Sequence, residues 1–160
     1  MRYFLLFFFI SFGIYAEVLD GIYYDWSVFT LTKSGEEKKC YTVSFPHKKL
    51  GNYKKNREPY ILVTRFQEKK IEEVSIYSGF EYKIASNVYI SVDGQQFAFK
   101  TKEDVAWTKT KEEDKKIIEI FLDSMGIKVR AESAKLEYIV DEYSLKGFVR
   151  AYKRIRELCK

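Results

Sequence analysis

The segment VYISVDGQQFAF, residues 88–99, contains the clearest indication of the fold. Strand-forming residues at Val88–Val92 and Gln95–Phe99 flank the dipeptide Asp93-Gly94. An Asp-Gly pair favours a type I′ turn, because its glycine accepts the positive φ angle that a two-residue hairpin requires. The segment therefore predicts an antiparallel β-hairpin.

Segments of similar character lie on both sides of this hairpin. Tyr60–Phe66 is a nearly continuous apolar run, which is typical of a buried central strand, and Ile71–Tyr77 follows with Val74 and Ile76 directed inward. Further strands are expected at Gly21–Thr32, Cys40–Phe45, Phe80–Ile84, Ile127–Ala131 and Leu136–Val140.

Two segments depart from the strand pattern and predict helices. Thr110–Ser124 begins with a capping box, in which Thr110 is the N-cap and Glu113 occupies the third helical position. From Ser144 onward, apolar residues recur at helical spacing; they are Leu145, Phe148, Val149, Tyr152, Ile155 and Cys159. Many short strands with two helices and no strand–helix alternation predict a mainly β fold. We expect a two-layer antiparallel β-sandwich or a small barrel, with the helices at an edge or end.

The first sixteen residues, MRYFLLFFFISFGIYA, have the order of a secretory signal peptide. Arg2 supplies a positive start, Tyr3–Ile10 an unbroken apolar run, and Ala16 a small residue at the expected cleavage point. The run is too short to span a bilayer, which needs about 20 helical residues. We expect export and cleavage after Ala16, with no transmembrane span in the remaining chain. The alternative is a buried N-terminal strand or helix.

Composition indicates one folded domain, residues 17–160. The chain has 160 residues, of which 46% are hydrophobic and 18% aromatic, and a formal net charge of +5. It is too apolar and too weakly charged for a disordered protein, and its length suits a single core. Without the expected signal peptide, which contains one charged residue, Arg2, the net charge is +4.

Positive charge is concentrated in the polar stretch from residue 47 to residue 57, which predicts a loop, and in the last helix. The loop is the expected binding surface, because loops on a rigid sandwich are common binding sites. Its cations and aromatic anchor are Lys48, Lys49, Tyr53, Lys54, Lys55 and Arg57. An exported protein is a poor partner for nucleic acid, so the clusters indicate an anionic envelope or host-surface component. The alternative is a solvated face.

Cys40 and Cys159 are the two cysteines of the chain. In an oxidising compartment such a pair usually bonds, so we expect a disulfide between them. If the fold places them far apart, two free thiols or an intermolecular bond are the alternatives. Neither a metal nor another cofactor is expected, since His47 is the single histidine and further soft ligands are lacking.

Sequence motifs for catalysis are missing. The chain has no glycine-rich phosphate loop and no nucleophile elbow. One further hypothesis is a hydrolase that uses Ser44, His47 and a distant carboxylate. The simpler alternative is that His47 is an exposed loop residue without a catalytic role. The acidic residues 112–114 fit the first turn of a helix, where they complement its dipole.

Several short motifs occur in an order and spacing that resemble one protein family. They are Asp25-Trp26, Cys40-Tyr41, EPYILVT at 58–64, EEVSIYSGFEYK at 72–83, VDG at 92–94, AWT at 106–108, YSLKGF at 143–148 and Cys159. On these motifs, nearly all of the chain after residue 16 resembles the invasion-associated locus B family of exported bacterial proteins. Many members carry a further cysteine shortly after the tryptophan, where this chain has Val28, Phe29 and Thr30, so a second disulfide is not expected.

The resemblance implies an immunoglobulin-like β-sandwich located in the periplasm, at the outer membrane or at the cell surface. It also implies, for some members, a link to host-cell invasion without established catalysis. We therefore expect an exported, non-enzymatic envelope protein that binds a partner and supports host-cell invasion or envelope interaction. The alternative is a periplasmic inhibitor or accessory factor of a specific enzyme.

Overall fold

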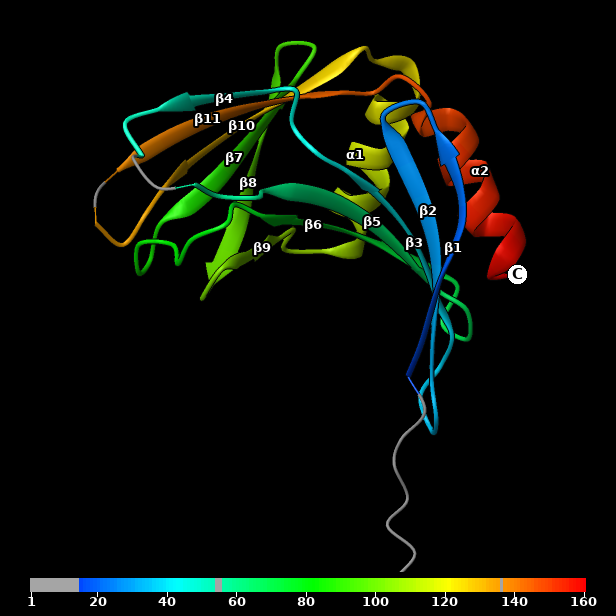
Figure 1. The fold of residues 1–160 in the computed structure, drawn as a ribbon. Coiled ribbons are helices and arrows are strands. Elements are labelled where there is room, and N and C mark those ends of the chain that lie inside the picture. Colours follow the sequence, from blue (N-terminus) through cyan, green and yellow to red (C-terminus); the bar gives the residue numbers. More distant parts are fainter. Residues whose placement is uncertain (1–14, 54–55, 136) are drawn as a thin grey trace, which may run out of the picture.

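A computed structural model describes residues 15–53, 56–135 and 137–160. In this part of the chain, antiparallel strands form one continuous sheet in the order β1-β2-β3-β5-β6-β9-β8-β7-β10-β11-β4 (Figure 1). The strands are β1 (Tyr15–Tyr23), β2 (Trp26–Lys33), β3 (Lys39–Ser44), β4 (Lys48–Gly51), β5 (Tyr60–Phe66), β6 (Ile71–Tyr77), β7 (Asn87–Val92), β8 (Gln95–Lys102), β9 (Val105–Trp107), β10 (Gly126–Glu132) and β11 (Tyr138–Ser144). The helices are α1 (Lys111–Asp123) and α2 (Phe148–Leu158). The mainly β fold with two helices, the second C-terminal, is confirmed.

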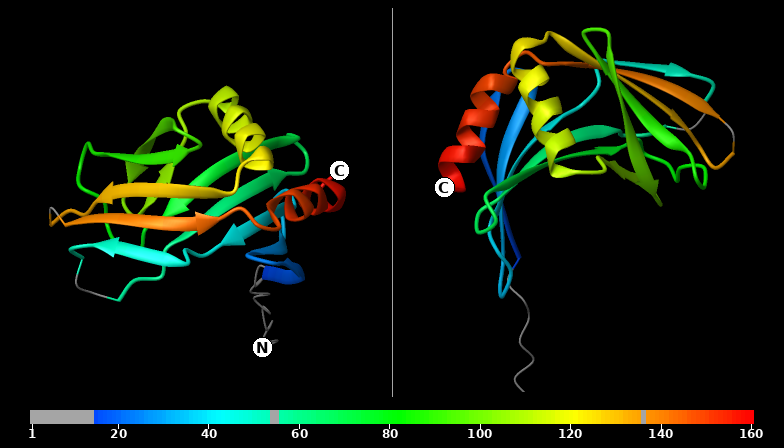
Figure 2. Two further views of the ribbon diagram at one scale, coloured as in Figure 1. Left: turned by 90° about the horizontal axis from the view of Figure 1, so that it is seen from above. Right: turned by 180° about the vertical axis from the view of Figure 1, so that it is seen from behind.

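β3 and β4 lie far apart in the strand order, although only residues 45–47 join them. The sheet must therefore curl strongly to bring the two strands together. Three linking residues span at most about 14 Å between the strand ends. The backbone N–H of His47 donates to the carbonyl of Glu142 in β11, and the indole N–H of Trp26 in β2 donates to the carbonyl of Ser144, both at 3.0 Å. The described strands therefore form one strongly curled sheet (Figure 2).

Both helices cover the same side of the β1–β6 half of the sheet (Figure 2). α1 packs on β6, and α2 packs on β1, β2, β3 and β5. The Phe148 ring of α2 lies against Trp26 and Phe121, with ring centroids 4.8 Å and 5.5 Å away. The expected N-cap of α1 is present, since the Thr110 hydroxyl accepts a hydrogen bond from the Glu113 N–H at 3.2 Å. The helices and one face of these strands thus share a single hydrophobic core.

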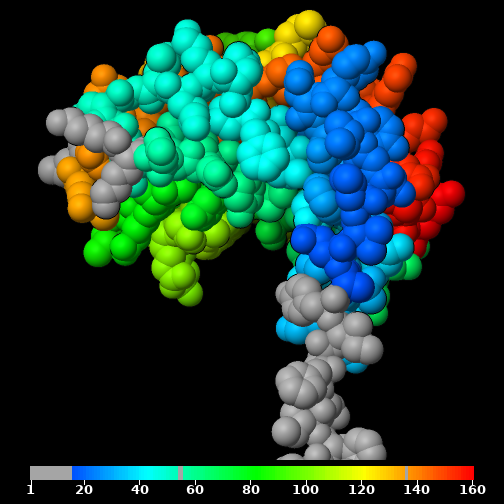
Figure 3. All heavy atoms as spheres, in the orientation of Figure 1, coloured from blue at the N-terminus to red at the C-terminus, as the bar shows by residue number. Residues whose placement is uncertain are grey.

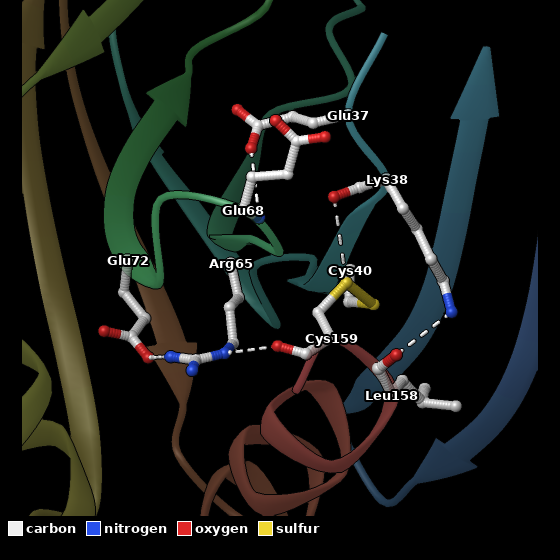
Figure 4. The surroundings of a disulfide bond; sticks show 8 residues. All are labelled: Glu37, Lys38, Cys40, Arg65, Glu68, Glu72, Leu158 and Cys159. Atoms are coloured by element: carbon white, nitrogen blue, oxygen red, sulfur yellow. Dashed lines mark hydrogen bonds and ion pairs between the residues drawn. A yellow bond between two sulfur atoms is a disulfide. The ribbon is translucent and has the colours of Figure 1, made fainter. Parts of the chain in front are cut away.

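Cys40 and Cys159 form a disulfide that joins β3 to the end of α2, with their Cα atoms 5.9 Å apart. Two more contacts hold the same helix end (Figure 4). The Arg65 Nε–H donates to the carbonyl of Cys159 at 2.8 Å, and the Lys38 ammonium donates to the carbonyl of Leu158 at 3.0 Å. The last turn of α2 is therefore fixed to β3 and β5.

The region expected to be one strand, Gly21–Thr32, is a hairpin in the structure. β1 ends at Tyr23 and β2 begins at Trp26, with Tyr24 at a φ of +56° in the turn between them. The backbone N–H of Asp25 donates to the carbonyl of Lys146 at 3.2 Å. The turn is therefore stabilised from the other end of the chain, which the local residue pattern does not reveal.

Two other elements expected from the sequence differ from those in the structure. The stretch from residue 47 to residue 57 is not entirely a loop, because Lys48–Gly51 pairs with β11 as strand β4. The stretch Phe80–Ile84 is not a strand but an irregular segment with an isolated bridge between Tyr82 and Ser133. Of the expected signal peptide, residues 1–14 lie outside the described residues.

Candidate functional site

The side of β2, β3, β5 and β6 that faces away from the helices carries a group of aromatic and aliphatic side chains. Residues on a strand alternate between the two faces of a sheet, so neighbours of the buried Val28, Thr42, Ile61 and Ile76 point to the other side. We call this group the aromatic face. Its members are Phe29, Leu31, Tyr41, Val43, Phe45, Tyr60, Leu62 and Tyr77.

The aromatic face forms an open depression of about 850 Å³ that neither helix covers. Figure 3 looks onto this side of the molecule, where the blue and cyan segments of β1 to β3 lie in front. Most of the lining side chains are half-buried, and Phe45 is 59% exposed. Large contiguous apolar surfaces are uncommon on monomeric proteins and mark interaction sites.

Cross-strand ring contacts organise the face into two clusters. Phe29 and Tyr41 stack with ring centroids 5.2 Å apart. Tyr60 stacks on Tyr77 at 4.9 Å and meets Phe45 edge-on at 6.3 Å. Such pairs stabilise the sheet and hold the rings in fixed positions.

Two phenol groups of the face, those of Tyr41 and Tyr60, have raised pKa values. The Tyr41 hydroxyl donates to the carboxylate of Glu17 in β1. Burial, followed by this hydrogen bond, raises the pKa of Tyr41 well above its usual range. Burial and the neighbouring Tyr77 raise the pKa of Tyr60 in the same direction. The face therefore provides apolar contact area with a few hydroxyl groups, which suits binding.

The structure separates the residues of the expected basic binding loop. Lys48 and Lys49 are exposed on β4, the edge strand. Tyr53 is half-buried and packs on Phe80, with ring centroids 5.0 Å apart, so it is not a free anchor. Lys54 and Lys55 lie outside the described residues.

Arg57 is not part of an exposed surface, contrary to expectation. Its side chain is 5% exposed, and its guanidinium makes two hydrogen bonds to Asp141, one of them at 2.6 Å. A third hydrogen bond, at 3.2 Å, goes to the carbonyl of Ser78. An arginine that is paired in this way holds the chain before β5 against β11 and is not available to a partner.

The hydrolase hypothesis finds no supporting geometry in the described part of the chain. Ser44 is fully buried, and its hydroxyl makes no hydrogen bond there. His47 is exposed on the surface. A nucleophile must lie within hydrogen-bond reach of its base and of a substrate, and this pair does not show that arrangement.

The described residues contain neither a membrane-spanning helix nor a metal-binding cluster. None of their helices is long and apolar enough to cross a bilayer. Their His, Cys, Asp and Glu side chains form no group of three or more that could hold a metal ion.

The comparison with protein families gives one match. The model of the family described as invasion associated locus B (IalB) protein matches residues 26–156. The chain belongs to the IalB family. Comparisons with curated proteins and with solved structures return no significant match.

The IalB match contains the whole aromatic face, from Phe29 to Tyr77, but begins after β1. The sequence does not predict this face, because the nearly continuous apolar run Tyr60–Phe66 is typical of a buried central strand. The available signal was the second set of large apolar residues on β3 and β5, at Tyr41, Val43, Tyr60 and Leu62. The sequence does not show which of two apolar strand faces is left uncovered.

Proposed function

We propose that this IalB-family protein is an exported, non-enzymatic protein of the cell envelope that binds a partner and supports host-cell invasion. The observation that carries the proposal is the uncovered depression of about 850 Å³ on the aromatic face. The family assignment supports export and invasion. Rigid aromatic side chains in a partly desolvated surface are the usual anchors of protein interfaces.

The chemistry of the face indicates which part of a partner it contacts. The two ring clusters, Phe29 with Tyr41 and Phe45 with Tyr60, are connected along β3 by Val43. At 3.3 Å per residue, Tyr41 and Phe45 are about 13 Å apart along the chain, which suits a short extended segment. Lys39 and Glu58 at the rim supply polar contacts of both signs.

Replacing Phe45 and Tyr60 together with Ser tests this assignment. We expect binding to detergent-solubilised envelope or host-membrane proteins, which present no bilayer, to fall about tenfold or more, because aromatic anchors carry much of the energy of an interface. The matched control replaces Tyr89 and Tyr138, two exposed tyrosines of β7 and β11, with Ser. Equal binding by both double variants would place the contact elsewhere.

The lysines of β4, together with Lys54 and Lys55 that follow in the sequence, are a second candidate contact for an anionic partner. Replacing Lys48, Lys49, Lys54 and Lys55 with Ser, while keeping the buried Arg57, removes the charges without breaking the Asp141 pair. A salt-dependent loss of envelope binding would support this contact. Unchanged binding would remove these lysines from the proposal.

The alternative function, a periplasmic inhibitor or accessory factor, would use the same aromatic face against one enzyme. A pull-down from periplasm distinguishes the two, since recovery of one stoichiometric enzyme favours the alternative. Protease treatment of intact cells tests the location. Cleavage of the protein indicates surface display, whereas protection indicates the periplasm.

A further inference from the structure

A second depression, of about 570 Å³, lies beside α2, on the helix-covered side of the sheet. It is formed by α2, the end of α1 and the turn between β5 and β6. We call it the basic cleft. Its lining residues are Arg65, Lys70, Leu122, Val149, Tyr152, Lys153, Arg156, Glu157 and Lys160.

The carboxylates near the basic cleft are already paired. Glu72 accepts a hydrogen bond from Arg65 and lies 3.9 Å from the Arg156 guanidinium. Glu157 lies 3.4 Å from Arg154. Within the described residues, Lys70 and Lys153 make no ion pair. The cleft therefore has a positive charge that its own surroundings do not neutralise.

The basic cleft also contains apolar surface among its cations. α2 buries Phe148, Ala151 and Ile155 in the core, but Val149, which recurs with them at helical spacing, is 53% exposed. Val149 lies on the same stripe of the helix as Tyr152 and Lys153, because positions three and four apart share a face. Leu122 of α1 completes the apolar part of the cleft.

The cleft is held in a fixed shape. The disulfide and the Arg65 and Lys38 hydrogen bonds attach the last turn of α2 to β3 and β5 (Figure 4). Lys70 lies in the β5–β6 turn at a φ of +51°, where its N–H donates to the carbonyl of Phe66 at 2.9 Å. Its lysines are therefore carried by well-anchored backbone.

We infer that the basic cleft docks the protein on an anionic lipid surface. The charge is complementary, since Lys70 and Lys153 can contact head-group phosphates while the exposed Val149 enters the boundary of the acyl chains. An acidic protein segment would need an apolar side chain at one defined position to cover Val149, whereas any anionic bilayer presents phosphates next to apolar acyl chains. The combination therefore favours a lipid surface over an acidic protein.

This orientation leaves the proposed binding face accessible. α2 and the aromatic face lie on opposite sides of the same strands, β2, β3 and β5. When α2 rests on a lipid surface, the aromatic face points away from it. The inference does not depend on the proposed partner binding, and it can fail or succeed separately.

The test measures sedimentation of the oxidised protein with vesicles of phosphatidylcholine that contain about one third phosphatidylglycerol, or with phosphatidylcholine alone. We expect binding to the anionic vesicles only. Replacing Lys70 and Lys153 together with Gln should weaken it about tenfold or more, because each lysine near an anionic surface adds several-fold to binding. Val149→Ser should weaken it further. The matched control replaces Lys100 and Lys102, two exposed lysines of β8, with Gln.

Two results would overturn the inference. One is an equal loss for the cleft variant and the β8 control, which would indicate only the effect of net charge. The other is binding to polyglutamate as strong as to anionic vesicles, together with no effect of Val149→Ser, which would indicate an acidic protein partner. Circular dichroism of each variant verifies that it is folded.

Discussion

Arg57 and Asp141 form a buried ion pair with two hydrogen bonds, and both side chains are almost completely removed from solvent. Burying two charges is costly, so the pair adds little net stability compared with apolar residues. Removing one of the two partners lowers the stability much more, because the other charge then stays buried and unpaired. The Arg57–Asp141 pair fixes the segment before β5 against β11, next to one end of the aromatic face.

Arg57→Ala should therefore lower the free energy of unfolding by about 3–5 kcal/mol, because the Asp141 carboxylate remains buried without a partner. Urea unfolding followed by fluorescence measures the change. Lys48→Ala is the control, since this lysine is exposed and lies 3.9 Å from Glu142; it should change stability by less than about 0.5 kcal/mol. A loss below 1 kcal/mol for Arg57→Ala, on the order of an exposed pair, would contradict the role of the buried pair.

Asp114 shows a different use of a carboxylate. It lies in the first turn of α1 but is 5% exposed, and one of its oxygens accepts a hydrogen bond from the Val74 N–H of β6 at 2.8 Å. This contact attaches the helix to the sheet. Burial raises the pKa of Asp114 to about 6, although the hydrogen bonds from Val74 and Thr108 act in the opposite direction.

A carboxyl group whose pKa is higher in the folded state makes the protein less stable as pH rises from about 4 to about 6, because the folded state binds the proton more tightly. We expect stability to fall over this range by up to about 3 kcal/mol. Asp114→Asn should abolish that fall and keep an acceptor for the Val74 N–H. Thermal unfolding of the wild-type protein and of the variant at several pH values measures this change in stability. An identical pH profile for the variant would refute the assignment.

At the scale of elements, the sequence predicts those strands whose signals are local. β5 and β6 have the expected boundaries, and the Asp93-Gly94 turn joins β7 and β8, with both residues at positive φ. β4 was missed because its lysines become a strand only through pairing with the edge of β11. The aromatic face was missed for a related reason, since whether a helix covers a strand face is decided by distant parts of the chain.

The disulfide allows a test of how firmly α2 is attached. Replacing Cys40 and Cys159 together with Ser should lower the free energy of unfolding by about 4–5 kcal/mol on the chain-entropy model, because the bond closes a loop of more than 100 residues. Urea unfolding of the variant and of the reduced wild-type protein should agree. A difference of less than about 1 kcal/mol from the oxidised protein would show that Arg65 and Lys38 alone hold the helix.

At the scale of the whole molecule, two candidate surfaces lie on opposite sides of one set of strands. α2 and the basic cleft are on the core side, and the aromatic face is on the other. The rigid sheet between them contains no described residue that belongs to both surfaces. The two surfaces should therefore act independently.

A variant that combines Phe45→Ser and Tyr60→Ser with Lys70→Gln and Lys153→Gln should show additive effects. We expect the free-energy losses in partner binding and in vesicle binding to match those of the separate double variants within about 0.5 kcal/mol. Partner binding is measured with detergent-solubilised envelope or host-membrane proteins, and vesicle binding is measured by sedimentation. A coupling larger than 1 kcal/mol, roughly fivefold, would show that the two surfaces communicate or overlap.

The separation of the two cysteines also constrains when the fold can be completed. Their positions are 119 residues apart in the sequence. In a chain that crosses a membrane N-terminus first, Cys40 emerges long before its partner, and oxidation within the same molecule must wait for residue 159. If the chain is exported in this way, as proposed, the bond forms only after residue 159 has crossed, and an oxidant that acts during translocation finds Cys40 alone and open to bonding with another molecule.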